Sequence, residues 1–219
     1  MAVDLPSSPL AAVDPEFEKM ALETGEFTFG LSGTNIREKL LQNLAQDVCR
    51  SHLGLAFHMH ITAAKMYGIS YPDMLAVIRF TAPYSGYPAA ADALARLQQV
   101  AQEIGLDTDD VGDPGTSPRA AEAAETFDIN DEWMRGFLNS RIARASSEHR
   151  LNRREQIIIA ITCDVSQQTL GDTFRRHLTL ALEAGVSIDD LRDIIRFCAE
   201  HSVARATSAL RELDRVLSG

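Results

Sequence analysis

The chain has 219 residues, of which 45% are hydrophobic and 24% are charged, as expected for a globular protein that can bury a substantial core. Its formal net charge is -10 at pH 7. Nucleic acids and anionic membrane surfaces attract proteins with a basic footprint, so this charge balance speaks against both as partners.

The start of the chain predicts a segment without regular structure. Residues 1–14 contain neither a basic stretch nor a continuous apolar one, so we expect a flexible N-terminus and not a signal peptide. The longest strongly apolar run, Ile157 to Ile161, is too short to span a bilayer. The three cysteines have no metal-binding spacing and fit a reducing compartment as buried apolar side chains. These features favour a cytoplasmic protein.

The segment that follows predicts consecutive helices. Residues 36–48 form one predicted helix, and apolar residues at helical spacing predict a second helix from Phe57 to Gly68. Gly68 would end that helix in the left-handed conformation. Ser70 and Asp73 then form a capping box for a third helix. Strand-like alternation is absent, so the sequence predicts an all-α fold.

Breaks and a linker divide this helical pattern. Pro88 forces its predecessor out of the helical conformation, so we expect a helix break over residues 85–88. Residues 107–119 are rich in Gly, Pro, Asp, Thr and Ser and read as a linker. Residues 120–145 again predict a helix. Its expected core positions are Phe127, Trp133, Phe137 and Ile142.

The second half of the sequence repeats the first at an offset of 117 residues. Over residues 35–89 this ungapped alignment gives 20 identities in 55 positions, where average composition gives roughly 3 or 4. We infer a tandem duplication of one helical unit. The predicted organisation is a first repeat over 15–106, a linker over 107–119 and a second repeat over 120–219.

Several of these segments carry a family resemblance. Residues 57–60, Gly68 to Ser70 and Ala82 to Ala90, together with Leu151 to Ile161, resemble the carboxymuconolactone decarboxylase family. The resemblance implies an alkylhydroperoxidase D-like orthogonal helix bundle. It also implies a homo-oligomer, a trimer or a dimer for a two-repeat chain, and a small-molecule substrate.

Two departures from the family pattern bear on function. The peroxidase branch carries a Cys-x-x-Cys before its histidine, but Leu170 and Thr173 precede His177 at those positions, which speaks against a thiol peroxidase. The copies have also diverged, because Tyr84 of the first copy corresponds to His201 of the second. A site built between the two repeats is therefore a natural interpretation.

The founding reaction of the family expels a carboxylate and protonates the resulting enolate. That chemistry needs a desolvating pocket, hydrogen-bond donors for the enolate oxygen and a proton donor with a pKa near neutrality. Imidazole suits the proton donor, so His60 and His177 are the primary catalytic candidates. The alternative is that both are hydrogen-bonded core residues. Tyr84 and Glu155 complete the catalytic candidates.

The substrate-binding candidates are polar residues near these positions. They are His58, Arg154, Glu38 and His201. The arginines could instead form ion pairs at helix starts. His58 and His60 point about 200° apart on a helix and cannot chelate one ion, so the sequence predicts neither a metal site nor a cofactor.

Two aspartates stand at the unfavourable end of their helices. Asp47 and Asp164 lie near C-terminal ends, where a negative charge opposes the helix dipole. We expect Arg79 or Arg196 to offset that charge.

The sequence leaves three functions open. The leading hypothesis is a decarboxylase-like carbon–carbon lyase that uses histidine-assisted proton transfer on a small conjugated lactone or carbonyl compound. A cyclase, dehydratase or isomerase would use the same proton donor and pocket. The third possibility is a non-catalytic helical oligomer.

Overall fold

A computed structural model describes residue 6 and residues 8–114 and 129–218. This part of the chain is helical without a strand, which confirms the all-α prediction. The elements are 3-10 helix η1 (Pro9–Ala12) and helices α1 (Pro15–Phe29), α2 (Ile36–Arg50), α3 (Leu55–Met66), α4 (Tyr71–Ser85), α5 (Tyr87–Glu103), α7 (Glu132–Ser146), α8 (Arg153–Gln167), α9 (Asp172–Glu183), α10 (Ile188–Phe197), 3-10 helix η2 (Cys198–Glu200) and α11 (Val203–Ser218).

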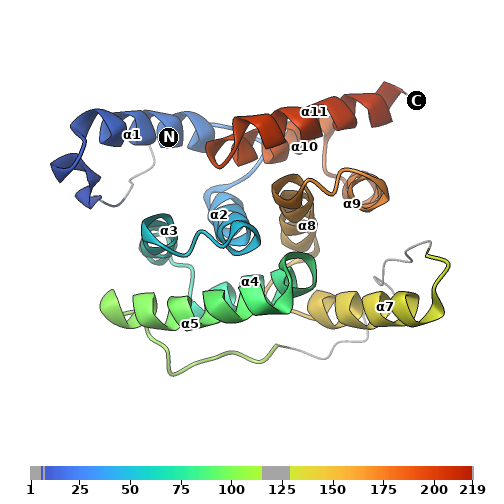
Figure 1. Cartoon of the computed structure of the whole chain (residues 1–219), viewed down its shortest axis with the longest axis horizontal. Helices are drawn as coiled ribbons and strands as arrows, with labels where there is room; N and C mark the ends of the chain where they lie inside the picture. Colours follow the sequence, from blue (N-terminus) through green and yellow to red (C-terminus); the bar gives the residue numbers. More distant parts are fainter. Residues whose placement is uncertain (1–5, 7, 115–128, 219) are drawn as a thin grey trace.

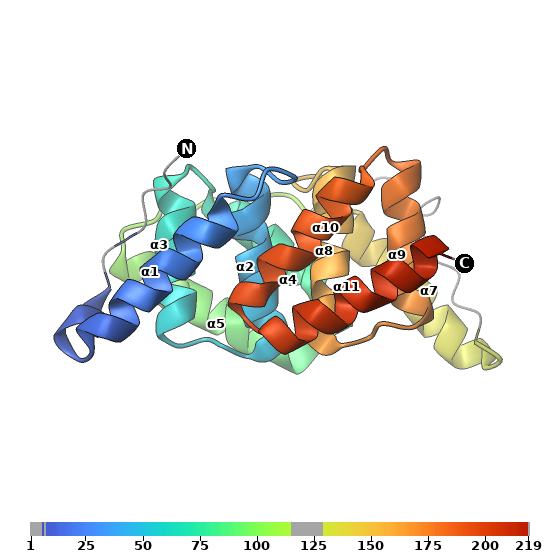
Figure 2. The same ribbon diagram turned by 90° about the horizontal axis from the view of Figure 1, so that it is seen from above.

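The helices form three layers. Figure 1 shows α3, α2, α8 and α9 in the middle layer, with α1, α10 and α11 on one side and α4, α5 and α7 on the other. Helices α2 and α8 pack against each other at the centre, as the second view also shows (Figure 2). Both are buried over most of their length because they face neighbours on several sides.

The helix positions recur along the chain. Helices α1, α2, α3 and α4 begin at residues 15, 36, 55 and 71, and α7, α8, α9 and α10 each begin 117 residues later. The offset is the one that aligns the sequence with itself. Phe57 of α3 and Phe174 of α9 occupy aligned positions, and both are fully buried in the core.

The turn residue and the capping box predicted before α4 are present in the structure. Gly68 follows α3 with φ of 77°. The side chains of Ser70 and Asp73 cap α4 reciprocally, so two backbone N–H groups of its first turn are satisfied. The break between α4 and α5 falls within the expected residues 85–88, but at Gly86, which has φ of 92°, a conformation that glycine adopts without a Cβ clash. The expected reason for the break is wrong, because Tyr87, the predecessor of Pro88, is the first residue of α5.

The predicted core of the helix before α8 is wrong in two positions. Ile142 is buried, but Trp133 and Phe137 are 71% and 42% exposed. They stack on each other one helical turn apart, with ring centroids 5.3 Å apart. Helix α7 packs on α4 through its other face, which carries Ile142 and Ala145, so the two aromatic rings face outward.

The predicted segment boundaries differ from the described structure at the N-terminus. Residues 9–12 form a 3-10 helix, capped by the Ser8 side chain, where the sequence predicts a flexible segment. Residues 107–114 form no helix, as expected for the start of the predicted linker, and 115–128, which include Phe127, lie outside the described residues.

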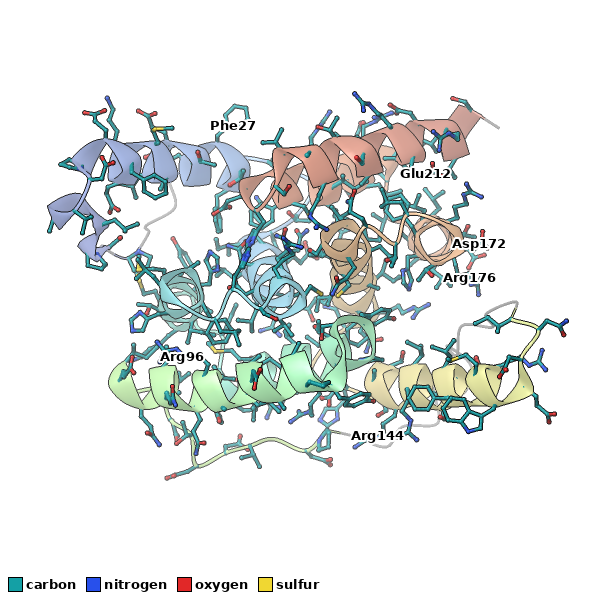
Figure 3. The ribbon with its side chains drawn as sticks, in the orientation of Figure 1. Phe27, Arg96, Arg144, Asp172, Arg176 and Glu212 are labelled. Atoms are coloured by element: carbon teal, nitrogen blue, oxygen red, sulfur yellow. The ribbon has the colours of Figure 1, made fainter. Side chains whose placement is uncertain are left out.

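The surface carries an exposed aromatic residue, and the cysteines lie in the interior. Phe27 projects from the outer face of α1 and is 83% exposed (Figure 3). Cys49, Cys163 and Cys198 are all buried, as the sequence predicts. Within the described residues, none of the helices combines the length and the apolarity that a membrane span requires.

Candidate active site

The candidate site is built around a histidine–aspartate pair in the first half. His60 comes from the middle of α3, and Asp47 comes from the last turns of α2. The imidazole Nδ1 donates a hydrogen bond to Asp47 Oδ2 over 2.6 Å. Asp47 is fully buried, whereas the His60 side chain keeps 16% exposure. The pair therefore holds a buried carboxylate against a ring that solvent can reach.

This pairing corrects the expected partner of both aspartates. Asp47 pairs with His60, and Asp164 pairs with His177. Arg79 instead makes a bidentate ion pair with Glu148, while Arg196 pairs with Asp193. The histidines, and not the arginines, offset the carboxylates at the ends of α2 and α8.

Three further polar side chains surround His60. The ring of His201, which follows η2, lies with its centroid 5.6 Å from that of His60. His52 stacks on His201 at 6.4 Å. Glu200 accepts a hydrogen bond from the Thr28 hydroxyl over 3.1 Å, so its carboxyl is held between α1 and η2. The second half thus contributes Glu200 and His201 to a site centred on the first half.

His60 also lines two adjoining cavities. One has a volume of about 150 Å³ and lies between α1, α2 and α3, with mostly apolar walls that include Leu22, Phe29 and Leu40. The other has a volume of about 460 Å³ and is lined by His52 and His201. Glu200 borders both cavities. The imidazole is therefore accessible from a pocket large enough for a small molecule.

The electrostatic environment shifts the proton affinities of these groups in different directions. Burial opposes the charged form of His60, but the charge and the hydrogen bond of Asp47 raise its pKa overall. Burial lowers the pKa of His201 to about 3, and the neighbouring His60 and His52 add to that effect. Burial raises the pKa of Glu200. At neutral pH, His201 is therefore an uncharged imidazole beside His60.

The second half holds an equivalent but closed arrangement. His177 Nδ1 lies 2.5 Å from Asp164 Oδ2, and both side chains are only 1% exposed. The Thr169 hydroxyl donates to the other carboxylate oxygen. The ring of Tyr84 meets that of His177 edge-on at a centroid distance of 5.8 Å. This pair is part of the core, whereas the His60 pair lines a cavity.

Each histidine faces a side chain from the other half of the chain. His60 lies beside His201, and His177 lies beside Tyr84, which aligns with His201 in the sequence. The structure therefore brings two of the proposed catalytic residues, Tyr84 and His177, together. It brings His60 to the proposed substrate-binding residue His201.

The comparisons with known proteins show the fold. A crystal structure of a provisionally named gamma-carboxymuconolactone decarboxylase subunit from Burkholderia xenovorans superposes with a TM-score of 0.57. The similarity covers 97% of this chain and 93% of that chain at 18% sequence identity. No protein-family model and no curated protein matches the sequence. The architecture is thus the alkylhydroperoxidase D-like helical fold, and at this identity the similarity extends to the fold alone.

The remaining acidic and basic candidates lie elsewhere. Arg37 Nε donates to Glu155 over 2.7 Å, and Arg154 Nε donates to Glu38 over 2.8 Å. Each glutamate also completes the capping box of its own helix. These reciprocal pairs join the first turns of α2 and α8. Since Glu38 stands nine residues before Asp47, the network lies about 14 Å along α2 from the histidine site.

His58 points away from His60. Its Nε2 atom lies 3.4 Å from the Glu103 carboxylate at the end of α5. The separation follows from the helical geometry, which places residues two apart on opposite faces. His58 therefore does not line the cavities at His60.

The sequence analysis did not identify Glu200 and His52 as residues of the site, and it assigned the wrong partner to Asp47. Asp47 precedes His60 by the same interval as Asp164 precedes His177, and this shared spacing was the available signal for the pairing. Glu200 aligns with Pro83, so only the second copy provides a carboxyl at that position. His52 has no counterpart in the second copy, where Thr169 stands.

Proposed function

We propose that the protein catalyses proton transfer on a small conjugated carbonyl or lactone compound, with His60 moving the proton. The observation that carries this proposal is the His60 imidazole, fixed by the buried Asp47 and lining an apolar cavity. A positioned imidazole in a largely apolar pocket contributes about 10²- to 10⁴-fold to such a reaction.

The hydrogen bond to Asp47 determines which nitrogen of His60 does the chemistry. Because Nδ1 donates to Asp47 Oδ2, the neutral ring carries its lone pair on Nε2. Nε2 can take a proton from the carbon next to a carbonyl, which leaves a conjugated enolate and an imidazolium. The Asp47 carboxylate stabilises that imidazolium. Return of the proton to another carbon of the enolate completes an isomerisation.

Glu200 is the candidate donor for the enolate oxygen. It borders the same cavity as His60, and burial raises its pKa, which favours the protonated carboxyl. A protonated carboxyl donates one hydrogen bond. Tyr84, one of the catalytic candidates from the sequence, lies at His177 and does not line either cavity at His60.

The charges around the cavities favour an uncharged substrate. Among the described residues that line the two cavities there is no Lys or Arg, but there are the carboxyls of Glu18 and Glu200. An ionised substrate carboxylate would find no guanidinium or ammonium partner there. Isomerisation or cyclisation of a neutral conjugated compound fits this lining better than decarboxylation of a dianionic lactone.

Decarboxylation is the second candidate reaction. It is supported by the name of the Burkholderia xenovorans protein that shares the fold, and it would use His60 to protonate the enolate left by carbon dioxide. The proposed homo-oligomer, trimer or dimer, remains a further prediction, and a solution mass measurement tests it.

The test uses two lactones in D2O followed by NMR. α-Angelica lactone is neutral and isomerises by proton transfer, whereas 4-carboxymuconolactone also carries the leaving carboxylate. We expect deuterium incorporation and isomerisation of the neutral lactone, reduced at least about 100-fold in His60→Ala. His149→Ala, a change at an exposed histidine outside the site, should match the wild type. A folded wild type that turns over neither lactone, or an equally active His60→Ala, would refute the proposal.

A further inference from the structure

We propose that Asp47, His60 and His201 form a binding site for a first-row divalent transition metal ion such as Zn²⁺. Each side chain offers one donor atom, and the three atoms lie within 4.8 Å of one another. The residues come from α2, α3 and the turn after η2, so two halves of the chain converge on one point.

The spacing is close to that of a metal centre. Bonds of about 2.1 Å in a tetrahedral site place ligand atoms about 3.4 Å apart. The three donor atoms lie within 4.8 Å of one another, so binding would draw the imidazoles somewhat closer to the ion. The His60 and His201 rings already lie at a centroid distance of 5.6 Å with their planes tilted by 41°, so both can turn edges toward a shared ion.

Two polar atoms of this cluster lack hydrogen bonds. Asp47 Oδ1 and His201 Nε2 are buried and have no partner among the described residues. Asp47 itself is fully buried. A buried polar atom without a partner costs about 1–3 kcal/mol, more if charged. Coordination of one cation by these atoms would satisfy the carboxylate oxygen and the imidazole nitrogen together.

The donor set selects the class of metal. Two imidazole nitrogens with one carboxylate suit Zn²⁺, Co²⁺ or Fe²⁺, whereas Mg²⁺ and Ca²⁺ prefer oxygen ligands throughout. Three protein ligands leave at least one position for solvent or a small molecule, and the cavities lined by His60 adjoin that position.

The second half provides an internal comparison. At the aligned positions Asp164 and His177 remain, but Tyr84 replaces His201. A neutral phenol is a poor ligand, so the closed pair lacks its third donor. A metal ion at the first site would take the lone pair that His60 needs for proton transfer. This loss of the His60 lone pair matters only if the proposed function is correct. The proposed metal site itself does not depend on that function.

The experiment measures binding without substrate. Metal-free, untagged protein is titrated with Co²⁺ while the visible absorption is recorded, and Zn²⁺ or Mg²⁺ is then added as competitor. We expect one equivalent of Co²⁺ per chain, displaced by Zn²⁺ and not by Mg²⁺. Because the readout is a spectrum, inactivity toward both lactones would reject the proposed function and leave this result standing.

Two variants connect the binding to the cluster. His201→Tyr copies the second half and should weaken Co²⁺ binding at least about tenfold. His149→Ala should bind as the wild type does. His201→Gln serves if the tyrosine variant does not fold. Absence of saturable binding, or equal binding by a folded His201 variant and the wild type, would overturn the proposal.

Discussion

The ring of Tyr84 closes over His177, edge-on at a centroid distance of 5.8 Å, and the His177 side chain keeps only 1% exposure. At the aligned position His201 leaves His60 in contact with a cavity. The presence of His201 in place of Tyr84 at the aligned position therefore accompanies the difference between a buried His–Asp pair and an accessible one. The buried pair is part of the core, and the accessible pair lines a cavity.

This difference predicts unequal effects on stability. His177→Ala leaves the Asp164 carboxylate buried without its histidine, so we expect a loss of about 3–5 kcal/mol in the free energy of unfolding. His60→Ala should cost less, because water from the adjoining cavity can solvate Asp47. Urea unfolding of both variants measures the difference. Equal losses in the two variants would contradict the assignment of His177 to the core.

Glu155, which the sequence placed among the catalytic candidates, belongs to the Arg–Glu network, and we predict a structural role for it. Glu155 accepts from Arg37 and from the backbone of Asn152, so Glu155→Gln keeps one acceptor and loses the charge. We expect a loss of about 1–3 kcal/mol in unfolding free energy. Lactone turnover should remain within about twofold of wild type.

The reciprocal variant Glu38→Gln is the matched control, because Glu38 holds Arg154 and Asn35 in the same way. Both variants should lose similar stability. A loss of turnover of about 100-fold or more in folded Glu155→Gln would restore its catalytic assignment.

Helix boundaries were predictable because they depend on local chemistry. Gly68 and Ser70 set a turn and a cap through contacts within a few residues, and the structure places both as predicted. The exposure of Trp133 was not predictable in this way, because it depends on which face of α7 meets α4. Periodicity identifies an apolar residue but not the orientation of the helix that carries it.

The site was predictable only in part for the same reason. The sequence identified His60 and His201, but the contact between them depends on how the turn after η2, in the other half of the chain, meets α3. Glu200 carries no local motif. Its place at the cavity follows from the same packing, which a single sequence does not reveal.

Alanine substitution should have opposite effects at two glycines, one at the break between α4 and α5 and one inside α7. Gly86 has φ of 92°, which strains any residue with a Cβ, so Gly86→Ala should lower the unfolding free energy by about 1–2 kcal/mol. Gly136 lies within α7, where an added Cβ meets open space, and Gly136→Ala should raise it by about 0.5–1 kcal/mol. Thermal or urea unfolding compares the two. A stabilised Gly86→Ala would show that the break does not need its left-handed residue.

The lowered pKa of the Asp73 carboxyl predicts how the stability of the fold depends on pH. Burial opposes its charge, but hydrogen bonds from Ser70 and the nearby Arg37 lower its pKa on balance below the ordinary value of 3.8. A carboxyl with a lowered pKa in the folded state stabilises the fold above its unfolded pKa. That contribution is lost as the pH falls through the folded value. The stabilisation by Asp73 is therefore complete at neutral pH and disappears below about pH 4.

The comparison with Asp73→Asn isolates this contribution from those of other acidic groups. Asparagine retains a carbonyl oxygen that can accept from Ser70, but it has no charge for Arg37. The wild type should be more stable than the variant at pH 7 by about 0.5–2 kcal/mol, the range of a helix cap. Urea unfolding at pH 7, 4 and 3 should show this difference narrowing as the wild-type carboxylate is protonated. A difference that stays constant over this range would mean that Asp73 acts through its shape and hydrogen bonds and not through its charge.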